Sequence, residues 1–64
     1  MEKNNSELLT EKEAAEFIRG SVKTLQARRY RHQPPVYYKV GGAIRYKIAD
    51  LEGWIESGKV EVGG

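Results

Sequence analysis

The chain is organised around one stretch, Ser21-Val22-Lys23-Thr24-Leu25-Gln26-Ala27-Arg28-Arg29-Tyr30-Arg31. A serine directly after Gly20 is well suited to cap a helix N-terminus, because its hydroxyl can accept a hydrogen bond from a free backbone amide. The residues after Ser21 are compatible with a helix, and four of them are cations with no carboxylate among them. The stretch therefore predicts a short helix with a strongly basic surface.

The charges of the whole chain are segregated around this stretch. No Asp or Glu occurs between Phe17 and Ala49, and all nine acids lie outside that span. The span contains eight cations: Arg19, Lys23, Arg28, Arg29, Arg31, Lys39, Arg45 and Lys47. The formal net charge of +2 thus conceals a basic middle and acidic ends. Such segregation is typical of a surface that binds a polyanion, although a charge run can also be no more than a solvated face.

Length and composition exclude several classes of protein. Sixty-four residues make one small domain, and the absence of Cys excludes disulfides and thiolate metal sites. No apolar run reaches the roughly 18 to 20 residues that cross a bilayer, and no signal-peptide pattern opens the chain. We therefore expect a soluble intracellular domain, in the cytoplasm, with no membrane partner.

The sequence also lacks the residue patterns of an enzyme. It contains no nucleophile–base pair, Gly-rich phosphate loop or metal-ligand cluster, and a chain this short seldom encloses a pocket. His32 is the only histidine in the sequence. It falls in a polar turn, where it either interacts with a helix C-terminus or touches a phosphate. We predict no catalysis, no cofactor and no metal.

Another helix is predicted before the central stretch. Thr10 and Glu13 have the spacing of a capping box, in which each side chain bonds the backbone amide of the other residue. Gly20 is expected to end this helix. Its expected apolar residues are Ala14, Ala15, Phe17 and Ile18. Upstream, residues 1–7 are expected to be flexible, and Leu8-Leu9 either forms a brief strand or simply covers the core.

A helix, a glycine and a Ser-capped helix make the pattern of a helix-turn-helix, whose two helices cross at a steep angle. At about 100° per residue, the second helix directs Val22, Leu25 and the stem of Arg29 toward the core. The head of Arg29 then reaches either a phosphate or an acid of the first helix. The opposite face carries Lys23, Thr24, Ala27, Tyr30 and Arg31.

A β-hairpin is predicted after the helix break at Pro34-Pro35. Residues 36–40 and 44–48 alternate as strands around a tight Gly41-Gly42 turn. One face is expected to be apolar and to pack on the helices: Val36, Tyr38, Val40, Ile44, Tyr46 and Ile48. The other face is expected to be basic: Lys39, Arg45 and Lys47.

A third helix is predicted over residues 51–57. Asp50 is its expected N-cap, Leu51, Trp54 and Ile55 have core spacing, and Gly58 ends it. Residues 8–58 are therefore expected to form the domain, and residues 59–64 a flexible tail.

In this order and spacing, the elements resemble the small winged helix-turn-helix proteins related to MerR, specifically the excisionase and AlpA-like group. The resemblance covers about residues 8–57. The residues that carry it are Leu8-Leu9-Thr10, Glu13-Ala14-Ala15, Ser21, Thr24-Leu25, Pro34-Pro35, Lys39-Val40-Gly41-Gly42, Arg45-Tyr46 and Asp50-Leu51-Glu52-Gly53-Trp54-Ile55. It implies a mainly α fold with a small β-hairpin as a wing. It also implies that the second helix enters the major groove of DNA and that the wing contacts the adjacent minor groove or backbone.

The resemblance implies a non-enzymatic, sequence-specific protein that binds double-stranded DNA. We expect an excisionase-like recombination directionality factor of a phage or mobile element, or one encoded by the bacterial cell in whose cytoplasm it acts. Such a factor bends attachment-site DNA and acts with a recombinase or integrase and with further copies of itself on tandem sites. A small AlpA-type transcriptional regulator is an alternative, and a protein-interaction module without DNA binding is an alternative of another class. The expected DNA-binding residues are Ser21, Lys23, Thr24, Ala27, Arg28, Arg31, Arg45 and Lys47.

Three positions depart from the pattern of this group, which often has Trp at position 28, Arg or a polar residue at 27, and Arg at 43. Ala27 and Ala43 cannot hydrogen-bond a base edge, although Ala27 could touch a thymine methyl group. Arg28 either reads a base in place of Ala27 or packs its stem where the Trp would be. Tyr30 either stacks on the sugar-phosphate backbone or packs under the wing, and Tyr37 is similarly open.

Overall fold

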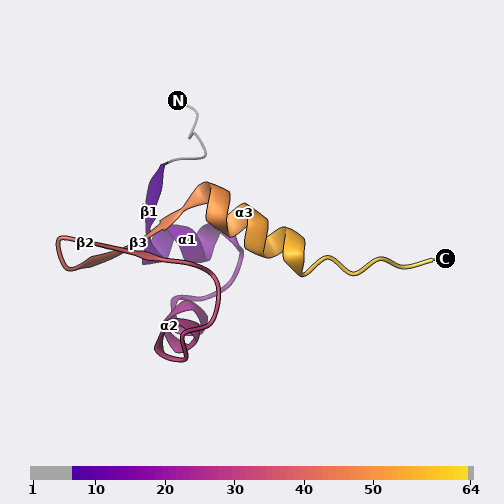
Figure 1. Ribbon diagram of the computed structural model, residues 1–64, viewed down its shortest axis with the longest axis horizontal. Coiled ribbons are helices and arrows are strands. Elements are labelled where there is room, and N and C mark those ends of the chain that lie inside the picture. The colour runs from indigo at the N-terminus through magenta and orange to yellow at the C-terminus, as the bar shows by residue number, and fades with distance from the viewer. Residues whose placement is uncertain (1–6, 64) are drawn as a thin grey trace.

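Three helices and a small antiparallel sheet make up the fold, which the computed structural model describes for residues 7–63. The elements are β1 (Leu8–Thr10), α1 (Glu11–Phe17), α2 (Val22–Tyr30), β2 (Tyr38–Val40), β3 (Ala43–Lys47) and α3 (Ile48–Ser57). Residues 1–6, predicted to be flexible, lie outside the described residues. The β2–β3 hairpin projects from the helices as a wing (Figure 1). This is a winged helix-turn-helix domain, as the sequence predicted.

The sheet has three strands in the order β1-β3-β2, all antiparallel. Of the two outcomes expected for Leu8-Leu9, the strand is confirmed: Leu9 lies opposite Tyr46, and Thr10 lies opposite Arg45. The wing is therefore not an isolated hairpin, because its β3 strand also pairs with the start of the domain. A third strand supplies the support that a two-stranded hairpin lacks.

The core draws on every helix and on two strands. Its buried residues are Leu9, Ala14, Ala15, Leu25, Tyr46, Ile48 and Leu51. Phe17 and Ile55, both expected in the core, are 38% and 48% exposed, so these predictions were wrong. At about 100° per residue, Phe17 lies roughly 110° from the midpoint of Ala14 and Ala15, whereas Ile18 falls close to it. Ile55 has the right phase, but it lies beyond the core, in a groove near Ile18 and Gly20.

Helix α1 begins as predicted and ends differently. Both capping-box bonds are present: the Glu13 amide donates to Thr10 Oγ1 at 3.1 Å, and the Thr10 amide donates to Glu13 Oε1 at 2.9 Å. The left-handed residue after the helix is Arg19, with φ +56°, and not Gly20. The amides of residues 19 and 20 donate to the carbonyls of residues 16 and 15, which completes a Schellman motif. Gly20 provides space instead, because a Cβ there would lie 3.2 Å from Ile18 Cδ1.

The wing turns at Gly41-Gly42, whose φ angles of +57° and +86° fit a two-residue type I′ turn. This turn pairs Lys39 with Ile44, and Tyr38 with Arg45. Residues opposite each other in an antiparallel pair share a face. Lys39 therefore lies on the apolar face, and Tyr38 lies on the basic face, opposite to the prediction. The two-residue loop is the cause: it pairs even-numbered positions of β2 with odd-numbered positions of β3.

Helix α3 follows β3 without a loop and starts at Ile48, three residues before its predicted start. Asp50 is therefore not the N-cap. Lys47 occupies that position without a side-chain cap bond, and Asp50 accepts a hydrogen bond from the Tyr38 hydroxyl at 3.0 Å. Gly58 is the C-cap, as predicted, and no helix or strand follows it up to residue 63.

Candidate nucleic-acid interface

Helix α2 is held at its N-terminus by the predicted serine cap. Ser21 Oγ accepts the amide of Thr24 at 3.1 Å and lies 2.9 Å from the Thr24 hydroxyl. Leu25 is completely buried, and Val22 packs against the core, so one face of the helix is fixed against the domain. The predicted orientation of α2 is confirmed by these two residues.

The opposite face of α2 is open to solvent. Lys23, Thr24 and Arg31 are exposed, and Ala27 between them is half-buried. Together with Ser21 at the N-cap, we call these residues the helix face. Its middle is small and its two ends carry positive charge. Such a surface allows a helix to approach a groove closely while cations at its ends reach phosphates.

Arg28 lies elsewhere. Its guanidinium carbon is 5.1 Å from the centre of the Trp54 ring, and its Nε donates to the carbonyl of Pro34. These contacts link α2 to α3 and to the loop before β2. The geometry favours the packed position of the two expected for Arg28, since a base contact would require it to leave both partners.

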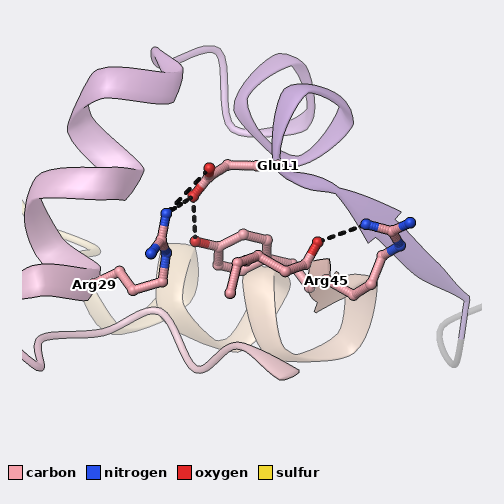
Figure 2. Close-up of polar contacts among 5 residues, drawn as sticks. Glu11, Arg29 and Arg45 are labelled. Atoms are coloured by element: carbon pink, nitrogen blue, oxygen red, sulfur yellow. Dashed lines mark hydrogen bonds and ion pairs between the residues drawn. The ribbon is translucent and has the colours of Figure 1, made fainter. Parts of the chain in front are cut away.

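Arg29 joins α2 to α1 and the sheet through Glu11 (Figure 2). Arg29 Nη2 lies 3.4 and 3.3 Å from the two carboxylate oxygens, and the Tyr46 hydroxyl donates to Glu11 Oε2 at 3.1 Å. The Arg29 and Glu11 side chains are only 17% and 16% exposed. Of the two destinations expected for Arg29, the acid of the first helix is the one observed.

The ionisation of this cluster follows from its surroundings. Burial opposes the charge on Arg29, but Glu11 and the Tyr46 hydroxyl outweigh it, so the pKa of Arg29 is raised. Burial, reinforced by the negative charge of Glu11, raises the pKa of Tyr46 to about 12, although Arg29 acts in the opposite direction. The cluster therefore keeps Arg29 charged and Tyr46 protonated at neutral pH.

The aromatic residues that the sequence left open lie around Arg29. Its guanidinium carbon is 5.3 Å from the Tyr30 ring centre and 5.9 Å from that of Tyr37. Tyr37 also lies against Tyr46, with ring centres 6.4 Å apart. Tyr30 remains 74% exposed, so it is not packed under the wing, and its stacking on DNA stays a prediction.

The two wing residues predicted to bind DNA are half-buried and have partners within the domain. Arg45 Nη1 donates to the carbonyl of Ile44 at 2.8 Å. Lys47 Nζ lies 4.9 Å from the centre of the Tyr38 ring, whose hydroxyl is bound to Asp50. Neither residue joins the helix face through a contact in the described part of the chain.

Two exposed cations of the acid-free span were absent from the predicted site, Arg19 and Lys39. Arg19 occupies the left-handed position of the turn between α1 and α2, and its side chain is exposed there. The face on which Lys39 lies could have been predicted from the sequence, because a two-residue Gly-Gly loop fixes the register of the hairpin. His32 takes a backbone role: its φ is +56°, and its amide donates to the Arg29 carbonyl at 3.1 Å, which helps to end α2.

Residues 7–63 also bear on metal binding and on membrane spanning. No cluster of three or more His, Cys, Asp or Glu side chains in this part of the chain is placed to hold a metal ion. None of its helices has the length and apolar character that crossing a bilayer requires.

Comparison with known proteins identifies a family for the fold. A family model described as a helix-turn-helix domain matches residues 8–59, which include every helix and strand described above. No curated protein and no solved structure matches the chain significantly.

Proposed function

Since the chain belongs to a family of helix-turn-helix domains, which bind double-stranded DNA, we propose that it is an excisionase-like recombination directionality factor of a phage or mobile element. In this role it binds and bends attachment-site DNA in the cytoplasm, beside a recombinase or integrase and further copies of itself on tandem sites. We also propose that it belongs to the MerR-related superfamily, a proposal that its winged form supports. A small transcriptional regulator of the AlpA type would use the same DNA-binding surface.

The observation that carries DNA binding is the helix face of α2. It is basic at both ends, and its residues Lys23 and Ala27 lie opposite the buried Leu25 on a helix capped by Ser21. In the proposed complex this face enters the major groove. Lys23 reads a base edge, and Ala27 lies against a thymine methyl group. Arg31, Ser21 and the free amides of the first turn bind phosphates.

Exposure of the cations sets the expected strength of phosphate binding. Of the eight cations in the acid-free span, four are exposed: Arg19, Lys23, Arg31 and Lys39. If each neutralises one phosphate, the slope of log K against log salt is about −3.6, from roughly 0.9 per phosphate. The half-buried cations add to this slope only if they leave their partners.

The test is fluorescence anisotropy of a labelled random duplex of about 25 base pairs, titrated with protein at several salt concentrations. Binding with a slope of about −3.6 supports the proposed surface. Absence of binding at low salt contradicts it. On a duplex then selected for tight binding, energy transfer between dyes at its two ends tests bending: an unchanged transfer efficiency would argue against the excisionase role.

Two substitutions on the helix face distinguish a phosphate contact from the recognition of a base. Arg31→Ala should weaken binding on all sequences and lower the salt slope by about 0.9, because it removes one phosphate contact. Lys23→Ala should also reduce the preference for the selected duplex over a random one. If each variant loses the same affinity for the selected duplex as for the random one, Lys23 does not recognise a base.

A protein-interaction module remains the second candidate, because one observation favours it. A groove of about 380 Å³ lies between the α1–α2 turn and the end of α3, lined by Ile18, Gly20, Thr24, Trp54, Ile55, Ser57 and Gly58. Its largest side chains are apolar, and Ile55 is 48% exposed. Exposed apolar patches often mark protein contacts. Failure to bind DNA even at low salt would make this groove the leading candidate site.

A further inference from the structure

We propose that Lys39 is the residue through which the wing contacts the DNA backbone, and that Arg45 and Lys47 face away from the duplex. This inference rests on the DNA binding proposed above and assigns a residue to the wing side of that interface. It reverses the roles expected from the sequence, where Arg45 and Lys47 were the wing contacts.

The register of the wing places Lys39 on the same side of the hairpin as the helices. Lys39 lies opposite Ile44, and the two residues therefore share a face. Ile44 packs against the core to which Ala14 and Ala15 of α1 and Leu25 of α2 belong. Lys39 is nevertheless exposed, because the tip of the hairpin projects beyond the helices (Figure 1). Lys39 thus belongs to the face of the wing that packs on the core to which α2 contributes.

Arg45 and Lys47 occupy the other face. They lie opposite Thr10 and Leu8 of β1, and Arg45 also lies opposite Tyr38 of β2. Figure 2 shows Arg45 directed away from Arg29, which belongs to α2, with its guanidinium turned back to the Ile44 carbonyl. This face points away from the helix that enters the groove.

The electrostatic setting of the two faces differs as well. Lys47 lies 4.9 Å from the Tyr38 ring centre, and the Tyr38 hydroxyl is bound to the carboxylate of Asp50. An acid on that face repels a phosphate and partly neutralises the nearby cation. The exposed cation Arg31 ends α2, the helix that lies on the side of Lys39. Because a helix and a wing on one duplex must present their cations toward the same side, Lys39 satisfies this requirement and Lys47 does not.

The experiment compares three variants that each remove one positive charge: Lys39→Gln, Arg45→Gln and Lys47→Gln. Anisotropy titrations on the same 25-base-pair duplex give the salt slope of each. Lys39→Gln should lower the slope by about 0.9, which corresponds to about eightfold weaker binding at 0.1 M salt. Arg45→Gln and Lys47→Gln should leave the slope within about 0.3 of the original, since a slope change of 0.9 marks one lost phosphate contact. Lys39→Arg should restore it.

The experiment distinguishes failure of the Lys39 assignment from failure of the proposed DNA binding. If the unmodified protein does not bind DNA at low salt, DNA binding itself fails. If it binds and Lys39→Gln leaves the slope unchanged, the assignment of Lys39 is overturned. Equal losses from all three variants would indicate long-range attraction without a specific contact, and would overturn it too. Far-UV circular dichroism of Lys39→Gln checks that an altered slope does not reflect unfolding.

Discussion

The ion pair between Arg29 and Glu11 should make a large contribution to the stability of so small a domain. Arg29→Met keeps much of the stem that packs beside the core and removes the guanidinium. Exposed ion pairs contribute about 0–1 kcal/mol, whereas breaking a fully buried pair costs about 3–5 kcal/mol. At 17% and 16% exposure the pair lies between these limits. We expect a loss of about 2 kcal/mol, most of it from leaving Glu11 with only the Tyr46 hydroxyl.

This loss is large beside the total. At roughly 0.05–0.15 kcal/mol per residue, a domain of this length has a free energy of unfolding of about 3–10 kcal/mol. A change of 2 kcal/mol should lower the thermal midpoint by about 8–16 °C. The assay is urea unfolding followed through Trp54, the single tryptophan, and through far-UV circular dichroism.

Arg31→Met is the matched control, because it removes the same charge from an exposed position at the end of the same helix. We expect it to change the free energy of unfolding by no more than about 0.5 kcal/mol. If Arg29→Met costs no more than the control, Glu11 does not hold α2 to α1, and the account of Arg29 as an internal residue is refuted.

Three further predictions concern single contacts. Folding raises the pKa of Tyr46 to about 12, so the contribution of its protonated hydroxyl to the free energy of unfolding is fully present below about pH 10 and is lost as the pH rises toward 12. Tyr46→Phe should therefore flatten the fall in the free energy of unfolding over this pH range. A fall that is the same in Tyr46→Phe would contradict the raised pKa. Thr10→Ala removes one half of the capping box and should cost about 1 kcal/mol in urea unfolding, whereas Lys12→Ala on the exposed side of α1 should not. Arg28→Ala should shift the emission of Trp54 without changing the salt slope of DNA binding; a slope reduced by about 0.9 would instead place Arg28 on a phosphate.

The helices could be predicted from local signals because those signals act within a few residues. The Thr10–Glu13 spacing is a capping box and Ser21 before Val22 is a serine N-cap, and both form as predicted. Leu25 and Val22 marked the inner face of α2 through their spacing alone. The end of α1 was less predictable, because Arg19 takes the strained left-handed conformation while Gly20 is needed for space beside Ile18.

The wing was the weaker part of the prediction, and the cause is the position of β2 at the sheet edge. Val36 and Val40 are 57% and 52% exposed, so the apolar alternation of this segment does not report a buried face. The loop length was enough to predict the register, since a two-residue turn pairs Val40 with Ala43. The start of α3 could not be found from Asp50, because its carboxylate binds a tyrosine that is 12 residues away in the sequence.

The cations of the acid-free span serve two physical purposes, internal contacts and an exposed basic surface, and the sequence alone does not distinguish them. Half of its eight cations are half-buried, each with a partner in the domain: Arg28 with Trp54 and Pro34, Arg29 with Glu11, Arg45 with the Ile44 carbonyl, and Lys47 with Tyr38. The other four are exposed to solvent. A count of charges treats all eight as available to DNA and gives a salt slope of about −7, whereas the exposed set gives about −3.6. A measured slope near −7 would therefore mean that binding releases the half-buried cations from their partners, and the domain would have to loosen at Trp54 as it binds.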